Sequence, residues 1–260
     1  ANRLSECGIS GNVTVNVPNG PYNEQVVFNT IPGSGPSALV TINGNGNILT
    51  ANTDATNRFV LRVANVSYLT IDDLVIQQGT FTTGWMGIQL YNSASNVTIS
   101  NCNIPTTAPS TSGSVAGIIG NGDPTSFITG GTFSNIRITE NTVTGPGKGI
   151  QLYGLDANLA TGLEIDHNTV NETGSDGIFF SATSGTLVHD NTVNFRLGDG
   201  IEIYQDNTNA HVYNNLISAT ASTSTGTVRG MYVSTTTTGT KAYNNLVWKI
   251  NATGANVYGI

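Results

Sequence analysis

The sequence predicts an all-β, single-domain solenoid of short stacked strands, and two repeated patterns carry this prediction. The first pattern is a Gly-Ile or Gly-Met dipeptide that opens a short run of alternating apolar residues. Its seven copies begin at Gly87, Gly117, Gly149, Gly177, Gly200, Gly230 and Gly259. Subtracting successive positions gives intervals of 30, 32, 28, 23, 30 and 29 residues. Such intervals are typical of solenoid repeats and not of a globular sandwich.

The second pattern is a unit of similar shape that lies between most of the Gly positions. Its copies occupy residues 97–104, 136–143, 163–170, 186–193, 210–217 and 240–247. We therefore predict two strands and two turns per coil. A 23-residue coil cannot also hold a helical crossover, so a parallel β-helix is favoured over a βαβ fold or a leucine-rich horseshoe. Equivalent residues then form columns with a spacing of about 4.8 Å.

One column of the second unit predicts an inward asparagine ladder. Aligning the units places one residue from each coil in this column: Leu74, Cys102, Asn141, Asn168, Asn191, Asn215 and Asn245. Stacked amides that bond to one another satisfy polar groups whose burial would otherwise cost a few kcal/mol each. Surface asparagines are the alternative, but a solvated residue has no reason to recur at one phase.

These Gly-Ile-x-x and Asn-Thr-Val repeats resemble the right-handed parallel β-helix family with the pectate-lyase-like fold, over roughly residues 59–260. The segments 7–17, 18–26 and 68–76 are similar to the opening of β-helix domains in large secreted bacterial surface proteins, many of them type IX secretion cargo. The resemblance implies a secreted or cell-surface location.

The organisation expected along the chain has two parts. Residues 1–58, broken by Pro18, Pro21, Pro32 and Pro36, are expected to form an N-terminal cap and irregular first coils. Residues 59–260 are expected to form the regular coils. Because residues 257–260 begin another coil, we expect an open C-terminal end and a chain that is a segment of a longer protein.

The amino-acid composition limits the classes of binding partner that the chain is expected to have. Charged residues make up 10% of the chain, the formal net charge is −7 and the pI is about 4.7, which disfavours nucleic acid and anionic membranes. No apolar run reaches the roughly 18 residues that span a bilayer, and no signal segment heads the chain, so we expect a soluble, mature protein. Cys7 and Cys102 lie far apart in coil order, and no disulfide is expected.

The outward columns of the Gly-Ile strands predict a glycan-binding strip. Aromatic rings and amides alternate there, and both suit a polysaccharide: Tyr91, Gln151, Tyr153, Phe179, Tyr204 and Tyr232. Inserts at 105–115, 218–228 and 248–257 are expected to rise beside the same edge. The alternative is that Tyr and Gln are ordinary strand residues on a solvated sheet.

The same strands carry an acidic cluster flanked by cations. One column reads Lys148, Asp176, Asp199 and Arg229, with Glu202 beside it. Asp176, Asp199 and Glu202 could hold calcium or act as a retaining carboxylate pair, with Lys148 or Arg229 as the base of a lyase. The alternative is a self-neutralising surface ladder. Neither the calcium-aspartate and arginine pattern of pectate lyases nor the Gly-His-Gly and Arg-x-Lys motifs of polygalacturonases can be matched here.

All three histidines fall on the second unit. The columns place Asp166 beneath His189, Glu164 two coils below His211 and His167 beneath Asp190. Zinc or acid-base chemistry would need these side chains to converge, and their different columns disfavour this.

The leading hypothesis is a non-catalytic module for adhesion or glycan binding that requires no cofactor. The alternatives are a polysaccharide lyase or glycoside hydrolase acting on an acidic polysaccharide, and a structural stalk or filament segment with end-to-end contacts. Mixed outward columns disfavour ice binding.

Overall fold

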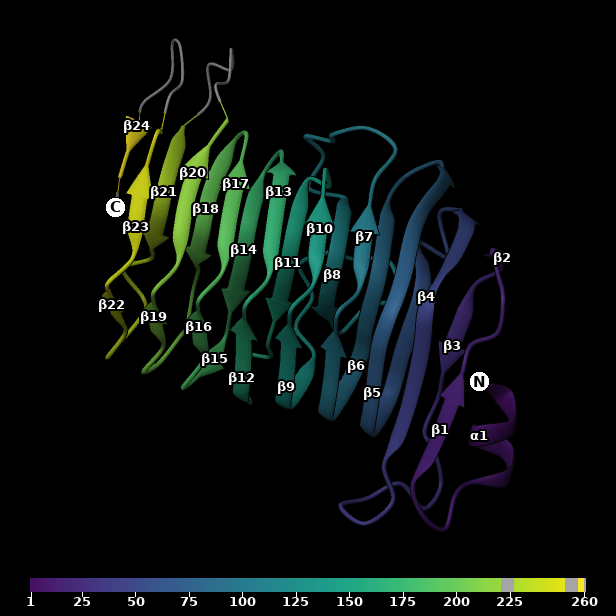
Figure 1. Cartoon of the computed structure of the whole chain (residues 1–260). Coiled ribbons are helices and arrows are strands. Elements are labelled where there is room, and N and C mark those ends of the chain that lie inside the picture. Colours follow the sequence, from purple (N-terminus) through teal and green to yellow (C-terminus); the bar gives the residue numbers. More distant parts are fainter. Residues whose placement is uncertain (221–226, 251–256, 260) are drawn as a thin grey trace.

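A computed structural model describes residues 1–220, 227–250 and 257–259 of the chain. Its strands stack in parallel along one axis to form a continuous β-solenoid, with the N- and C-terminal regions at opposite ends (Figure 1). The prediction of an all-β parallel solenoid is confirmed. We refer to the three faces of each regular coil as the first, second and third face.

The N-terminal elements precede the regular coils. They comprise a short helix, three short strands and three long strands that bend around the corners of the coil: α1 (Asn2–Cys7), β1 (Val13–Asn16), β2 (Tyr22–Asn23), β3 (Val26–Phe28), β4 (Val40–Thr53), β5 (Phe59–Phe81) and β6 (Trp85–Ser100). Strand β4 already pairs in parallel with β5 over most of its length. Coil stacking therefore begins within the first 58 residues.

Each regular coil contributes one strand to each face, except that β15 and β16 of one coil both lie on the second face. The first face holds β8 (Val115–Asn121), β11 (Lys148–Tyr153), β14 (Asp176–Ser181), β18 (Gly198–Ile203), β21 (Val228–Val233) and β24 (Val257–Tyr258). The second holds β9 (Thr132–Thr139), β12 (Ala160–Asp166), β15 (Thr183–Ser184), β16 (Leu187–His189), β19 (His211–Tyr213) and β22 (Lys241–Tyr243). The third holds β7 (Asn103–Pro105), β10 (Thr142–Thr144), β13 (Thr169–Thr173), β17 (Thr192–Phe195), β20 (Leu216–Ala219) and β23 (Leu246–Trp248).

The prediction of two strands per coil was wrong, because every second unit bends in its middle. The residue before the ladder position adopts a left-handed conformation, with φ between 51° and 58° in Asp73, Asn101, Glu140, His167, Asp190, Asn214 and Asn244. This turn separates a strand of the second face from one of the third. A sequence alignment shows the column but not the sign of φ, since Asn, Asp and His are only enriched in this region and Glu seldom adopts it.

The inward asparagine ladder is confirmed. Asn141, Asn168, Asn191 and Asn215 are each 1% exposed. Each donates from Nδ2 to Oδ1 of the asparagine one coil further on, at 2.9–3.0 Å, and that same Oδ1 accepts the backbone N–H. Leu74 and Cys102 precede the asparagines in this column, and strand register extends it one coil further back to Asn47. The N–H of Cys102 donates to Asn141 Oδ1 at 2.9 Å. The ladder thus satisfies buried amides that could not reach water.

The Gly-Ile dipeptide has a steric cause. Within the described residues, the residues that follow these glycines form a fully buried inward column: Ile88, Ile118, Ile150, Ile178, Ile201 and Met231. The neighbouring glycines lie where the coils approach most closely: a Cβ on Gly177 would meet the carbonyl oxygen of Gly200 and the side chain of Val193. Only glycine allows this spacing of backbones.

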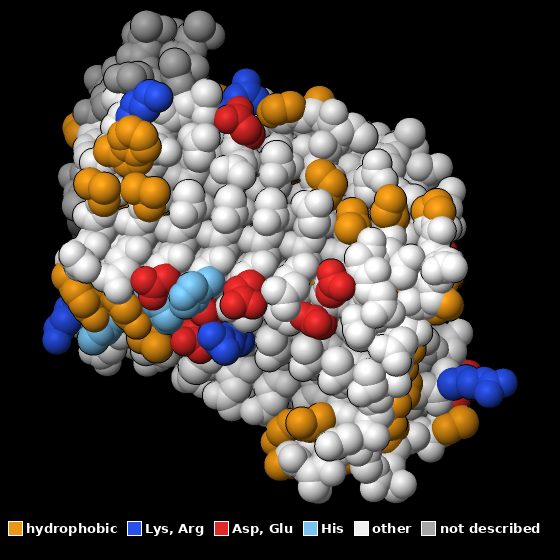
Figure 2. Space-filling view, in the orientation of Figure 1, with side chains coloured by type: hydrophobic (Ala, Val, Ile, Leu, Met, Phe, Trp, Pro, Cys, Tyr) orange, Lys and Arg blue, Asp and Glu red, His pale blue; other side chains and the backbone are white. Residues whose placement is uncertain are grey.

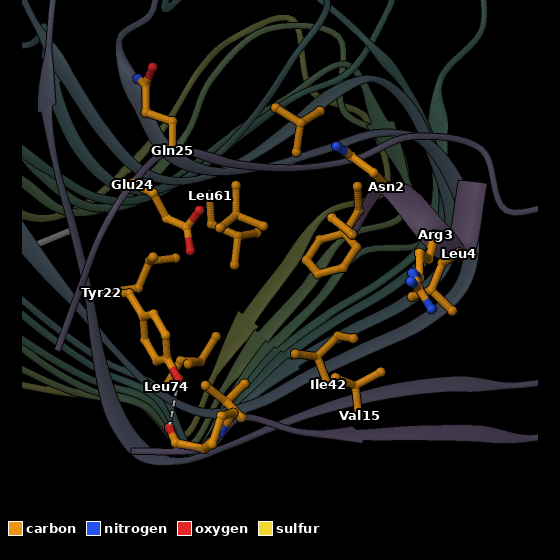
Figure 3. Close-up of a pocket in the computed structure, with 17 residues that line it drawn as sticks. Asn2, Arg3, Leu4, Val15, Tyr22, Glu24, Gln25, Ile42, Leu61 and Leu74 are labelled. Atoms are coloured by element: carbon orange, nitrogen blue, oxygen red, sulfur yellow. Dashed lines mark hydrogen bonds between the residues drawn. The ribbon is translucent and has the colours of Figure 1, made fainter. Parts of the chain in front are cut away.

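The N-terminal end of the coil interior is not filled by side chains. A cavity of about 780 Å³ lies there, bordered by α1 and by β1 to β5 (Figure 3). Apolar side chains such as Ile42, Leu61 and Leu74 line it, with Arg3 and Glu24 among its polar residues.

Both cysteines are free, as expected: Cys7 is exposed and Cys102 is buried in the ladder column. Burial raises the pKa of the Cys102 thiol to about 12. Among the described residues, no helix is long and apolar enough to cross a membrane.

Candidate functional site

The predicted acidic cluster comes together on the outward side of the first face. Strand register places Lys148, Asp176, Asp199 and Arg229 opposite one another on four consecutive strands, β11, β14, β18 and β21. Glu202 lies in the next outward column, between Phe179 and Tyr232. One carboxylate oxygen from each of Asp176, Asp199 and Glu202 lies within 4.8 Å of the others.

Two ion pairs organise this cluster. The Arg229 guanidinium forms a bidentate ion pair with Asp199. Its Nε donates to Oδ1 at 2.5 Å and its Nη2 donates to Oδ2 at 2.6 Å. Lys148 Nζ lies 3.0 Å from Asp176 Oδ2, which also accepts a 3.0 Å bond from Ser175 Oγ. Asp176 and Asp199 are only 5% and 2% exposed, so these pairs hold charges that water cannot solvate.

Glu202 is the member with the most altered acidity. Burial, followed by repulsion from Asp176 and Asp199, raises the pKa of Glu202 to about 8. Burial also raises the pKa of Asp199, although Arg229 opposes this. At neutral pH the Glu202 carboxyl is therefore largely protonated. It can donate a hydrogen bond as well as accept one.

The same contacts bear on the predicted calcium site. Calcium prefers six to eight oxygen ligands and gains most from ionised carboxylates. Here both aspartates are already neutralised by cationic side chains, and Glu202 carries a proton. Calcium would have to displace Lys148 or Arg229, or deprotonate Glu202, so the acidic trio suits proton-dependent chemistry better than a resident cation.

Three rings of the predicted aromatic strip, Tyr153, Phe179 and Tyr204, lie side by side, and their faces are largely occupied within the protein. The ring centroid of Phe179 lies 5.7 Å from that of Tyr153 and 5.5 Å from that of Tyr204. The Lys148 ammonium also lies 4.4 Å from the Phe179 centroid. Arg229 covers one face of Tyr232 at 3.7 Å. Because their ring faces are in these contacts, the half-buried Tyr153, Tyr204 and Tyr232 are better suited to hydrogen bonding through their hydroxyls than to stacking against a sugar.

The N-terminal part of the first face is covered by an insert that was not expected from the sequence. Residues 122–131 fold over the outward side, where Phe127 packs in a small external core with Phe59, Met86, Ala116 and Ile119. Gln151 is fully buried beneath this insert and donates from Nε2 to the carbonyl of Phe127. Gln151 therefore offers no surface to a glycan.

Tyr91 also lies in this N-terminal part of the face. It is half-buried, and the guanidinium of Arg62 lies 5.0 Å from its ring centroid.

The sequence signal that could have revealed the insert at 122–131 was Gly122-Asp123-Pro124. These residues form a turn that Asp123 caps by accepting from the N–H groups of Thr125 and Ser126.

The other inserts were predicted to line one edge of the site. The loop after β7 does lie there: the N–H of Ser110 donates to Gly145 at 2.7 Å, next to the start of β11. Most of the predicted loops at 218–228 and 248–257 falls outside the described residues.

The histidine columns have the predicted register but do not converge. Asp166 faces His189 across neighbouring strands, and Glu164 is two coils from His211. His189 lies 2.8 Å from Asp190 and 3.2 Å from Glu164, while His167 lies 2.8 Å from Asp166. The His167 and His189 imidazoles thus pair with different carboxylates, and His211 instead packs edge-on against Tyr243. Among the described residues, the acidic trio is the only group close enough to share a metal ion.

Comparison with known proteins agrees with this architecture. Residues 134–259 match the family model described as "Right handed beta helix region". Together with the strand registers, this match shows that the chain is a right-handed parallel β-helix. A search of curated proteins finds no match to the chain.

Two solved structures share the fold at low sequence identity. A GH136 lacto-N-biosidase from Eubacterium ramulus matches with a TM-score of 0.67 and 15% identity, over 98% of this chain and 52% of that one. The Streptococcus pneumoniae surface protein and adhesin PfbA matches with a TM-score of 0.54 and 12% identity, over 98% and 84%. The chain therefore spans about half the length of the first structure, and these likenesses establish the fold alone.

Proposed function

We propose that this chain is a carbohydrate-binding β-helix module that recognises a neutral glycan at the Glu202 site. The observation that carries the proposal is the position of the Glu202 carboxyl, which lies within 4.8 Å of the buried carboxylates of Asp176 and Asp199 and next to Tyr232 in the strand register. This position raises the pKa of Glu202 to about 8, so that its carboxyl is neutral at pH 7. A neutral carboxyl and phenolic hydroxyls can exchange hydrogen bonds with sugar hydroxyls in both directions.

The charge balance of the site favours a neutral glycan over an acidic one. At neutral pH the two cations, Lys148 and Arg229, are matched by Asp176 and Asp199, and Glu202 adds no charge. A uronate carboxylate would find no free cation. The same pairing disfavours a lyase, because an ion-paired Lys148 or Arg229 is a poor proton acceptor.

Binding of soluble neutral and acidic oligosaccharides, measured by calorimetry, tests this proposal. Glu202→Ala should abolish binding, whereas Glu202→Gln should retain most of it because an amide also donates and accepts. Wild-type affinity should fall as pH rises through about 8, and the Gln variant should not share this fall. Glu140→Gln, at an exposed turn of another face, is the matched control. Equal binding by wild type and Glu202→Ala would refute the proposed site.

Glycoside hydrolysis is a second candidate, supported by the pairing of a protonated with an ionised carboxyl. A general acid of raised pKa beside a carboxylate is the arrangement that retaining glycosidases use, with carboxyl groups about 5–5.5 Å apart. In this scheme Glu202 protonates the leaving oxygen and Asp176 is the second carboxylate. Reducing-end release separates the candidates, because Glu202→Gln would lose turnover and keep binding. Asp176→Ala would also lose turnover.

The biological setting follows as part of the same proposal. A glycan-binding solenoid suits a secreted or surface-exposed bacterial protein that adheres to polysaccharide. A role for calcium can be tested in the same assay. If the ion pairs fill the site, adding calcium or a chelator should leave the glycan affinity unchanged. A chain that neither binds nor cleaves any glycan would instead fit a structural stalk.

A further inference from the structure

The third face carries a flat, uncharged grid of hydrogen-bonding side chains. Strands β10, β13 and β17 pair in register, so their outward residues form two straight columns. We call this grid the Thr-Asn face, and its members are Thr142, Thr144, Thr169, Asn171, Thr192 and Asn194. Figure 2 shows this region as a broad band free of charged and apolar side chains.

The polar groups of this grid are largely unused within the protein. Among the described residues, the only hydrogen bond that involves the side chain of a member is that from Thr220 Oγ1 to Asn194 Oδ1, at 3.0 Å. Outward asparagines elsewhere behave differently, because they pair along the axis, as Asn43 does with Asn16 and Asn92 with Asn65. The Thr-Asn face therefore keeps donors and acceptors available to a partner.

The same two columns end in an apolar patch at the C-terminal end of the described coils. Strand register continues from Thr192 to Leu216 and Leu246, and from Asn194 through Ser218 to Trp248. Leu246 is 60% exposed and Trp248 is 48% exposed. The Lys249 ammonium lies 5.7 Å from the Trp248 ring centroid. Figure 2 shows the apolar cluster at this end of the face.

This combination selects one kind of partner. A face without formal charge gives no preference for an ionic polymer, whereas rows about 4.8 Å apart along the axis offer a repeating set of hydrogen bonds. A pyranose ring needs both features, since its hydroxyls bond to Thr and Asn side chains and its C–H surface packs on an indole. A flat grid suits a chain laid on a surface and not a sugar held in a pocket.

We propose that the Thr-Asn face and the patch formed by Leu216, Leu246 and Trp248 together dock onto a neutral, insoluble polysaccharide. This surface is separate from the Glu202 site, which lies on the first face. The two proposals can therefore fail independently.

Depletion of the full chain from solution by suspended microcrystalline cellulose and by chitin tests the proposal. Trp248→Ala should lower the partition coefficient at least tenfold on the polymer that binds. Tyr243→Ala is the matched control, because Tyr243 is 47% exposed on the neighbouring second face. It should leave retention unchanged.

A second variant tests the grid without removing the apolar patch. The triple substitution Thr142→Lys, Thr169→Lys and Thr192→Lys places three charges in one column and should also reduce retention tenfold. Thr161→Lys, at an exposed strand position on β12, is its control. Circular dichroism verifies that each variant is folded.

Several outcomes would overturn the proposal. These are no retention of the wild type on either polymer, equal retention of wild type and both face variants, or loss of retention in Glu202→Ala alone. Inhibition of ice growth, or self-association that Trp248→Ala abolishes, without polymer retention would assign the face to another partner.

Discussion

Removing a central rung of the asparagine ladder should be far more costly than removing its last rung. Asn168 is 1% exposed and takes part in a dense set of bonds. Its Nδ2 donates to the carbonyls of Ile138 at 2.8 Å and Asp166 at 2.9 Å, and its Oδ1 accepts from the N–H of Asn141 at 3.0 Å. Substitution by alanine removes these partners from the Ile138 carbonyl and from the N–H of Asn141, whereas the Asp166 carbonyl still accepts from the N–H of Glu140.

The size of the effect follows from counting the groups that lose their partners. Each stranded buried donor or acceptor costs about 1–3 kcal/mol, so losing two partners in Asn168→Ala should lower the free energy of unfolding by about 2–6 kcal/mol. Asn245 is only half-buried, and Asn215 donates to it at 2.9 Å. Water can replace those bonds, so Asn245→Ala should cost about 1 kcal/mol.

Urea unfolding at pH 7, followed by far-UV circular dichroism and by tryptophan fluorescence, measures both variants. Coincident transitions would justify a two-state fit, and unchanged slopes would assign the shift to stability. Equal losses in the two variants, or a loss below 1 kcal/mol in Asn168→Ala, would show that the buried amides do not stabilise the stack as argued.

Three further predictions concern the first face and the coil spacing. In the folded state the pKa of Glu202 is raised from 4.5 to about 8, so its contribution to stability is present at acidic pH and is lost as pH rises from about 4.5 to 8. Melting temperatures measured across this range should show the loss in wild type and not in Glu202→Gln. Arg229→Ala strands the Asp199 charge and should cost about 3–5 kcal/mol in urea unfolding, and adding Asp199→Asn should recover more than half of it. Gly177→Ala should cost at least 1–3 kcal/mol because its Cβ meets neighbouring backbone, whereas Gly35→Ala, with open space around its Cα, should change stability by less than 1 kcal/mol.

The repeat itself was visible in the sequence for a physical reason. Parallel stacking puts the same residue of every coil in the same environment, so a requirement such as a buried amide at Asn168 recurs at a fixed phase. The glycine column, the ladder and the row from Lys148 to Arg229 could all be aligned before any coordinates. The turn that splits each second unit could not, because its left-handed residue is Asn, Asp, Glu or His in different coils.

What the sequence by itself determined was the order of residues along each column, because hydrophobic alternation and repeat length set which residues stack. Only the tertiary structure decided which outward residues meet solvent. The insert at 122–131 buries Gln151, and burial beside two aspartates raises the pKa of Glu202 to about 8. Those properties depend on groups distant in sequence that cover the face, and no repeat pattern records what lies above a strand.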